Sequence, residues 1–146
     1  MRKTAMTIFA SAIIILFLSA QAFAQTALPD YTKWSKNASS NTSAVHNGTR
    51  VILLAEFYEN LDVDNLYLSS VVIIHDEQKR PWIALYIRTT LYKDGNKLVP
   101  AGTEYYLFEN SNNKWSVAKD FSKSKDLEKD TADFLKSQYD LEFKQW

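Results

Sequence analysis

The clearest pattern of apolar and polar positions lies at residues 81–93, where side-chain character alternates with a period of two. Such alternation is typical of a β-strand with two different faces. The aliphatic face carries Ile83, Leu85, Ile87 and Leu91, and the aromatic face carries Trp82, Tyr86, Arg88 and Tyr92. Asp94-Gly95 follows and predicts a tight hairpin turn. We therefore expect a return strand from residue 96 or 97 to Glu109, with a bulge or break at Pro100-Ala101-Gly102.

Three further segments predict strands. Residues 66–75 contain a β-branched run suited to burial on both faces, and residues 114–119 follow a polar turn at residues 110–113. Residues 50–58 also predict a strand, although the spacing of their apolar positions fits a helix as well. If the four-residue turn pairs Glu109 with Lys114, the facing pairs are Phe108 with Trp115, Tyr106 with Val117, and Glu104 with Lys119.

The C-terminal residues 124–143 predict a helix with Ser124 as its N-cap, because an apolar stripe follows at helical spacing. Residues 25–49 are mostly polar, with a helical turn capped by Asp30 and then a loop at residues 35–48. We therefore expect one α+β domain at residues 50–146, an antiparallel meander of about five strands with the helix packed on one face. In general shape this is similar to the cystatin-like or NTF2-like folds, an analogy of architecture alone.

The first 24 residues predict a secretory signal peptide. Arg2 and Lys3 precede an apolar run at residues 8–20, and Ala22-Phe23-Ala24 forms a cleavage site before Gln25. The run has about 13 residues, fewer than the roughly 20 that a transmembrane helix needs. An uncleaved N-terminal anchor is the alternative. No second run of that length follows, so we expect a periplasmic or secreted protein with no membrane span after cleavage.

Composition narrows the classes of function. The chain contains no cysteine, which excludes a disulfide framework and a lipid anchor on cysteine. Basic and acidic residues number 17 each, and no basic cluster stands out, so we expect no nucleic-acid partner. Asn37, Asn41 and Asn47 each begin an N-glycosylation sequon, although a polar loop rich in Asn and Ser gives the same pattern.

Few groups fit a catalytic site. His75-Asp76-Glu77 lies at a strand end, and His46 lies far away in the sequence. A histidine with carboxylates can bind a metal or act as an acid and a base, but neighbouring residues of a strand point to opposite faces. The sequence shows no nucleophile motif, phosphate-binding loop or metal-ligand spacing. We therefore expect a charged turn here, with no cofactor and no metal.

The aromatic face of the central strand is the strongest candidate for recognition, because rigid rings beside a planar cation suit a ligand or partner contact. In the simplest hairpin register its members are Trp82, Tyr86, Arg88, Tyr92 and Tyr105. The face expected beneath the helix carries Ile83, Leu85, Ile87, Tyr106, Phe108, Trp115 and Val117. A bulge at Pro100 would move Tyr105 to the other side, and an aromatic face that is simply buried core is the alternative.

These observations predict an exported, non-catalytic binding or interaction domain for a small ligand, a glycan or a protein. The first alternative is a small secreted hydrolase or metal-dependent enzyme that uses His75 with Asp76 or Glu77. The second is an inhibitor or accessory protein that pairs through a sheet edge, which requires an exposed and unblocked edge strand.

Overall fold

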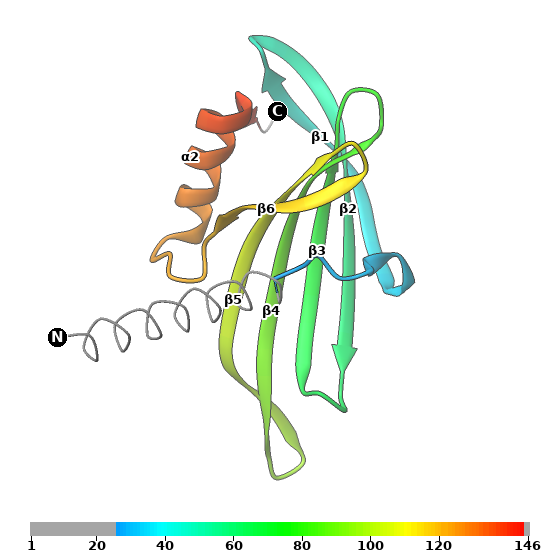
Figure 1. Ribbon diagram of the computed structural model, residues 1–146, viewed down its shortest axis with the longest axis vertical. Helices are drawn as coiled ribbons and strands as arrows, with labels where there is room; N and C mark the ends of the chain where they lie inside the picture. Colours follow the sequence, from blue (N-terminus) through cyan, green and yellow to red (C-terminus); the bar gives the residue numbers. More distant parts are fainter. Residues whose placement is uncertain (1–25, 145–146) are drawn as a thin grey trace, which may run out of the picture.

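A computed structural model describes residues 26–144, and the expected signal peptide, residues 1–24, lies outside them. Seven antiparallel strands form one sheet in the order β6-β5-β4-β3-β2-β1-β7, which curls around the α-helix (Figure 1). The elements are the 3-10 helix η1 (Tyr31–Lys33), the strands β1 (Ser35–His46), β2 (Thr49–Asp62), β3 (Tyr67–His75), β4 (Pro81–Asp94), β5 (Lys97–Ser111) and β6 (Lys114–Asp120), the helix α2 (Leu127–Tyr139) and the strand β7 (Leu141–Phe143).

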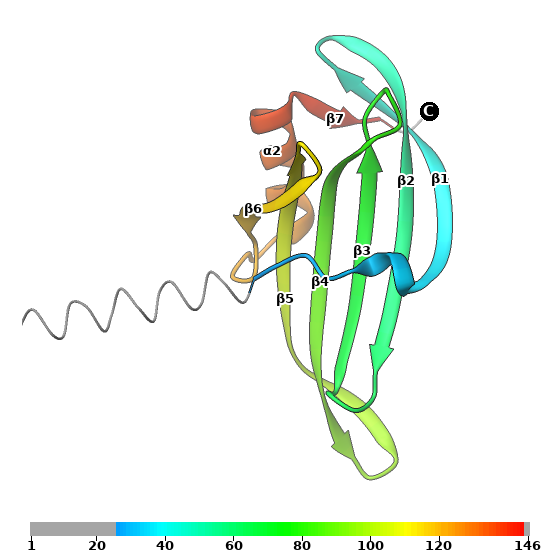
Figure 2. The same ribbon diagram turned by 45° about the vertical axis from the view of Figure 1, so that its right-hand side comes forward.

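The predicted α+β fold, a meander of about five strands with a cystatin-like or NTF2-like shape, is wrong. Strands β1 to β6 follow one another as a meander, and β7 then returns to pair with the end of β1. The sheet therefore bends into a half-barrel in which the first and the last strand are neighbours (Figure 2). The two strands absent from the prediction, β1 and β7, both lie at this margin of the sheet.

Strand β1 occupies most of the segment predicted to be a loop, residues 35–48. Its first seven residues are exposed and, apart from Ala38, polar, so no hydrophobic alternation marks it as a strand. It pairs with β2 from end to end, and Asn47 and Gly48 form the connecting turn with φ angles of 51° and 76°. Pairing with an apolar neighbour makes this segment a strand. The neighbour, β2, confirms the strand predicted at residues 50–58 and excludes the helical alternative.

The hairpin predicted at Asp94-Gly95 and the irregularity predicted at residues 100–102 are both confirmed. The register of β4 and β5 shifts where β5 inserts Ala101, which has no partner residue on β4. One inserted residue inverts the faces of everything that follows it. The facing pairs beyond the bulge include Tyr86 with Tyr106 and Arg88 with Glu104.

The turn between β5 and β6 is shorter than the predicted four residues. Asn112-Asn113 forms it alone, with φ angles of 53° and 61°, so that pairing starts at Ser111 and not at Glu109. The predicted cross-strand pairs are therefore wrong. Because side chains alternate between the two faces of a strand, a register error of two residues leaves each side chain on the same face. Phe108 and Trp115 therefore still pack in one cluster.

Helix α2 is shorter than the helix predicted at residues 124–143. Asp126, not Ser124, is its N-cap, and the Asp126 carboxylate accepts a hydrogen bond from Lys129 N at 3.2 Å. Asp140 ends the helix in a left-handed conformation with φ 50°. The chain then turns into β7. The predicted turn capped by Asp30 is confirmed as η1.

Both faces of the sheet are covered. Helix α2 covers one face, and the residues buried there form the helix-side core: Ala44, Leu53, Ile74, Ile83, Leu107, Phe121, Leu135 and Leu141. Residues 26–34, which we call the strap, cross the other face (Figure 2). The residues buried there form the strap-side core: Val71, Ile73, Ala84, Tyr86 and Phe108.

The contents of the two faces differ from the prediction. Ile83 belongs to the helix-side core as expected. Four residues expected beneath the helix pack instead on the strap side: Tyr106, Phe108, Trp115 and Val117. The bulge at Ala101 is the cause, because it inverts the parity of β5 relative to β4 and β6 follows β5.

Candidate ligand-binding site

A cavity of about 600 Å³ opens on the strap side of the sheet, and we call it the strap cavity. It is lined by Thr26 and Ala27 of the strap, Tyr86 and Arg88 of β4, Glu104 and Tyr106 of β5, and residues 117–120 of β6. Hollows of this size that combine aromatic surface with a few polar groups are usual sites for small molecules. Three neighbouring strands and the strap thus form a hollow of ligand size.

An ion pair between β4 and β5 lies in the wall of this cavity. Arg88 Nε and Nη2 donate to Glu104 Oε2 at 2.8 and 2.5 Å, and the guanidinium carbon lies 4.9 Å from the ring centroid of Tyr67. Burial alone lowers the pKa of Arg88, but the hydrogen bonds and charge of Glu104 outweigh it and raise that pKa. The two side chains are 36% and 37% exposed, so a ligand can reach the pair.

Two tyrosines supply the aromatic surface. The rings of Tyr86 and Tyr106 are stacked, with centroids 6.4 Å apart and an interplanar angle of 26°. Tyr106 OH donates to Glu104 Oε1 at 3.1 Å. Burial, and then this hydrogen bond, raise the pKa of Tyr106, so its hydroxyl is protonated at neutral pH. Tyr86 is 7% exposed, and it contributes to the cavity wall beside Arg88.

Strand β6 brings charges of both signs to the rim. Lys119 is exposed and forms no ion pair within residues 26–144. The neighbouring Asp120 is engaged in a turn, where its Oδ1 accepts a hydrogen bond from Ser122 N at 2.8 Å. The strap cavity therefore combines a lysine at the rim, an ion pair in the wall and tyrosine side chains.

The five residues predicted for recognition lie in three places. Tyr86 and Arg88 line the strap cavity. Trp82 and Tyr105 pack against the helix-side core instead. Tyr92 is 47% exposed near the β4–β5 turn. The structure therefore does not assemble the five residues into one surface. Only Tyr86 and Arg88 line the cavity.

Of the lining residues that were not predicted for recognition, Glu104 and Tyr106 contribute most to the chemistry of the cavity, because they contact Arg88 and Tyr86. A regular hairpin places Tyr106 beneath the helix, whereas the structure places it in the strap cavity. The signal that reveals the inversion is Pro100-Ala101-Gly102, because one inserted residue there moves both side chains to the face of Arg88.

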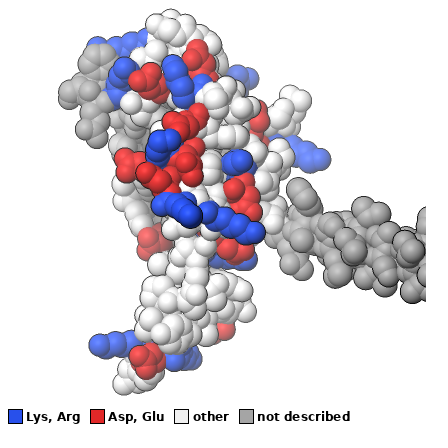
Figure 3. All heavy atoms as spheres, turned by 90° about the vertical axis from the view of Figure 1, so that its left-hand side faces the viewer, with Lys and Arg blue, Asp and Glu red and all other residues white. Residues whose placement is uncertain are grey.

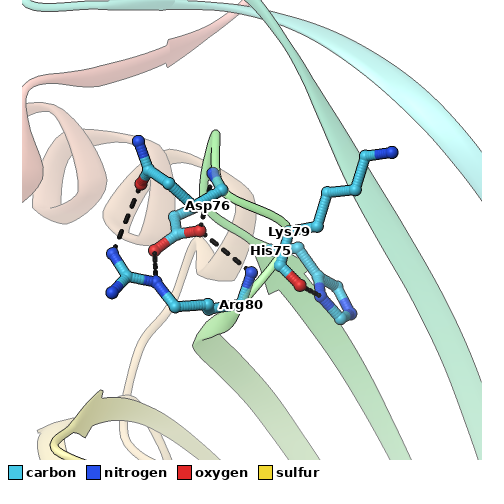
Figure 4. Close-up of polar contacts among 5 residues, drawn as sticks. His75, Asp76, Lys79 and Arg80 are labelled. Carbon is cyan, nitrogen blue, oxygen red and sulfur yellow. Dashed lines mark hydrogen bonds and ion pairs between the residues drawn. The ribbon is translucent and has the colours of Figure 1, made fainter.

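The predicted catalytic alternative, His75 with Asp76 or Glu77, lies at the end of β3 and in the loop that follows it. Figure 4 shows that the Asp76 carboxylate is directed into its own turn, where it accepts hydrogen bonds from two backbone N–H groups and from Arg80 Nε at 3.0 Å. His75 Nδ1 lies 3.2 Å from the carbonyl oxygen of Lys79. Asp76 therefore organises the turn, and none of the three predicted residues lines the strap cavity.

The carboxylate that contacts His75 is Glu56 of β2, the only charged residue in the apolar run 51–58. His75 Nε2 lies 3.2 Å from Glu56 Oε1, with side-chain exposures of 13% and 14%. The same carboxylate binds Lys36 Nζ at 3.0 Å and accepts a hydrogen bond from Tyr58 OH. We call these four residues the Glu56 cluster. Because both oxygens of Glu56 are engaged, the cluster links β1, β2 and β3 rather than offering a free base.

Contacts within the Glu56 cluster shift the pKa values of Glu56 and Tyr58. The hydrogen bond from Tyr58, followed by that from Lys36, lowers the pKa of Glu56. Burial, followed by the hydrogen bond to Glu56, raises the pKa of Tyr58 to about 12. A carboxylate that stays ionised and a phenol that stays neutral make a stable acceptor–donor pair over a wide range of pH.

The second histidine meets a different carboxylate. His46 Nδ1 lies 3.4 Å from Glu77 Oε1, and its ring lies 5.2 Å from that of Trp82. The two histidines are thus assigned to separate carboxylates. Within the described part of the chain, no three His, Asp or Glu side chains gather in an arrangement that could hold a metal ion.

Charged side chains of both signs intermingle on the face that carries α2 (Figure 3). On the helix itself, Lys129 pairs with Asp133 at 2.8 Å and Lys136 with Asp140 at 3.4 Å. This face therefore shows no surface of one sign that would attract nucleic acid. Neither helix within residues 26–144 has the length and the apolar character that crossing a membrane requires. Comparison of the chain with protein-family models, curated proteins and solved structures gives no match.

Proposed function

We propose that this chain is an exported, non-catalytic binding domain that holds a small ligand in the strap cavity. The observation that carries the proposal is the convergence of Tyr86, Arg88, Glu104 and Tyr106 on one hollow of about 600 Å³. These side chains supply ring surface, donors and an acceptor, the groups by which pockets fix the orientation of small molecules. Export is supported by the signal-peptide pattern of residues 1–24.

The lining indicates the chemical class of the ligand. Stacked tyrosine rings favour a flat or ring-shaped apolar surface. A guanidinium carries five N–H donors in a fixed fork, and Glu104 engages only two of the nitrogen atoms of Arg88. Lys119 adds positive charge at the rim. The best match is a small ring compound that carries hydroxyl or carboxylate groups, such as an acidic sugar or an aromatic acid.

The test measures binding to the exported product of the full-length chain. Glucuronate, galacturonate, glucose, benzoate and 4-hydroxybenzoate are screened by thermal shift, because a ligand of the native state raises the melting temperature. Calorimetry then gives the dissociation constant of each compound that raises it. We expect at least one of the acids to bind, and glucose to bind more weakly than the acidic sugars.

Matched variants assign the binding to the cavity. Arg88→Ala should weaken binding by about tenfold or more, because it removes the main donor group. Arg80→Ala is the control, since Arg80 also pairs with a carboxylate, Asp76, but outside the cavity. The proposal is wrong if none of the five compounds binds at about 10 mM, or if the two variants bind equally well.

A further inference from the structure

A second hollow, of about 510 Å³, lies between the end of β6 and α2, and we call it the helix-side hollow. Its lining comes from the last residues of β6, from the loop that follows β6 and from α2. Figure 1 shows α2 directly after this loop, beside the end of β6. The volume falls within the range of small-molecule pockets, so this hollow can also hold part of a ligand.

The helix-side hollow and the strap cavity share a wall. Lys119 and Asp120 line both of them. Lys119 pairs with Leu107, a residue of the helix-side core. Asp120 pairs with Tyr106, which lines the strap cavity. Because β6 is the outermost strand of the sheet, no strand within residues 26–144 lies beyond it, and the two hollows are neighbours around its end.

Two carboxylates of the helix-side hollow are held in place by neighbouring side chains. Asp130 Oδ2 accepts a hydrogen bond from Ser124 Oγ at 2.5 Å. Asp133 Oδ2 binds Lys129 Nζ at 2.8 Å. A carboxylate can accept about four hydrogen bonds, so each of the two can also accept one from a hydroxyl group of a ligand.

Two lysines and a ring supply the other contacts. Lys119 and Lys123 are exposed, and both line the helix-side hollow. An ammonium donates up to about three hydrogen bonds and pairs with a carboxylate. Phe134 of α2 adds ring surface, which packs against the apolar face of a ligand ring. These groups match a sugar unit that carries hydroxyl and carboxylate groups, the same chemistry as in the strap cavity.

We propose that the ligand is a short chain of acidic sugar units, which runs from the strap cavity around the end of β6 into the helix-side hollow. The inference rests on the proposed function and specifies the chemical class of its ligand. Each hollow alone has the size of a small-molecule pocket, so two hollows with a shared wall suit linked units better than one ring. Lys119 lies at the shared wall and Lys123 beyond it, which allows successive units to meet one cation each.

The test measures affinity against chain length. Calorimetry compares galacturonate with its linear dimer, trimer and tetramer on the exported product of the full-length chain. We expect the dissociation constant to fall by about tenfold or more from monomer to tetramer, because linked units occupy both hollows. Equal dissociation constants overturn the proposal. Binding of an aromatic acid without binding of any galacturonate also overturns it, but leaves the proposed function in place.

Matched charge variants assign the gain to the helix-side hollow. Lys123 lines this hollow and not the strap cavity, and Lys125 lines neither. Lys123→Glu should weaken binding of the tetramer by about fivefold and leave binding of the monomer unchanged. Lys125→Glu changes the net charge equally and should leave both unchanged. Equal tetramer binding by the two variants overturns the proposal.

A steric pair of variants gives the second test. Ser137 of α2 lines the helix-side hollow, and Ser137→Trp places a large ring in it. Its exposed neighbour Gln138 lines neither hollow, so Gln138→Trp is the control. Ser137→Trp should bind the tetramer no better than the monomer, whereas Gln138→Trp should keep the gain. A gain that persists in Ser137→Trp contradicts the path through this hollow.

Discussion

The two faces of the sheet are covered in different ways. The helix-side core is wholly apolar, and α2 packs over it with Leu135 only 6% exposed. The strap-side core is smaller and is bordered by ionisable groups, with the Glu56 cluster toward β1 and the Arg88–Glu104 pair toward β5. A helix suits a face that only stabilises the fold, whereas a thin strap leaves room for polar groups and a cavity. We therefore expect the helix side of the sheet to contribute most of the stability and the strap side to contribute recognition.

The largest loss of stability is therefore expected on the helix side. Leu53 is 1% exposed in that core, and Leu53→Ala should lower the free energy of unfolding by about 2–5 kcal/mol, because it removes buried surface and leaves a void. Urea unfolding measures the change. Its neighbour Ile52 is 70% exposed, and Ile52→Ala should cost less than about 0.5 kcal/mol. Equal losses in the two variants would contradict the assigned faces.

A smaller loss is expected for Glu56→Gln on the strap side, about 1–3 kcal/mol at pH 7, because His75 and Lys36 lose a charged acceptor. The pKa of Glu56 is lowered in the folded protein. Its contribution is therefore present above the ordinary glutamate pKa and is lost as the pH falls through the folded pKa. Urea unfolding between pH 7 and pH 3 should show a weaker acid dependence in this variant. Glu59→Gln, at an exposed site of β2, should behave as wild type.

The loss of stability at alkaline pH tests the same cluster through Tyr58. Because the pKa of Tyr58 is raised to about 12, its contribution is intact below about pH 10 and is lost between about pH 10 and 12. Tyr58→Phe should reduce that loss by on the order of 1 kcal/mol. Unfolding curves at intervals from pH 9 to pH 11.5 measure it. Tyr92→Phe, at an exposed site, is the control, and an unchanged slope in Tyr58→Phe would contradict the raised pKa of Tyr58.

The smallest effect on stability should come from the cavity itself. Glu104→Gln removes a pair whose members are more than one-third exposed, and such pairs contribute about 0–1 kcal/mol. Thermal unfolding without ligand should therefore be nearly that of wild type, while the affinity for the compound found by screening falls. A loss of stability as large as that of Leu53→Ala would mean that this pair supports the fold and not recognition.

The sequence was informative where the chain carries its own pattern. The alternation from Trp82 to Tyr92 predicts β4 to within one residue of its end, because each side chain there meets a different environment. Strand β1 carries no such pattern, since its polar residues become a strand by pairing with β2. Strand β7 follows α2 after a single left-handed residue, Asp140, and its three residues are too few for a period to show.

Only part of the candidate site could be predicted from the sequence, for a related reason. Tyr86 and Arg88 follow from the alternation of β4, but Glu104 and Tyr106 join them only through the bulge at Ala101. Local spacing indicates that a bulge is present and not which residue it inserts. The cavity also needs the strap to cross the sheet, a contact between segments about 60 residues or more apart, whose loop closure no local pattern encodes.

The pairing of β7 with β1 has a consequence for the order of folding. A ribosome releases the N-terminal part first, so the six-strand meander can form while the helix-side core is still open to water. Leu135 and Leu141, at 6% and 1% exposure, enter that core only after α2 and β7 have been synthesised. A nascent chain that has not yet reached them presents a bare apolar sheet to chaperones and proteases.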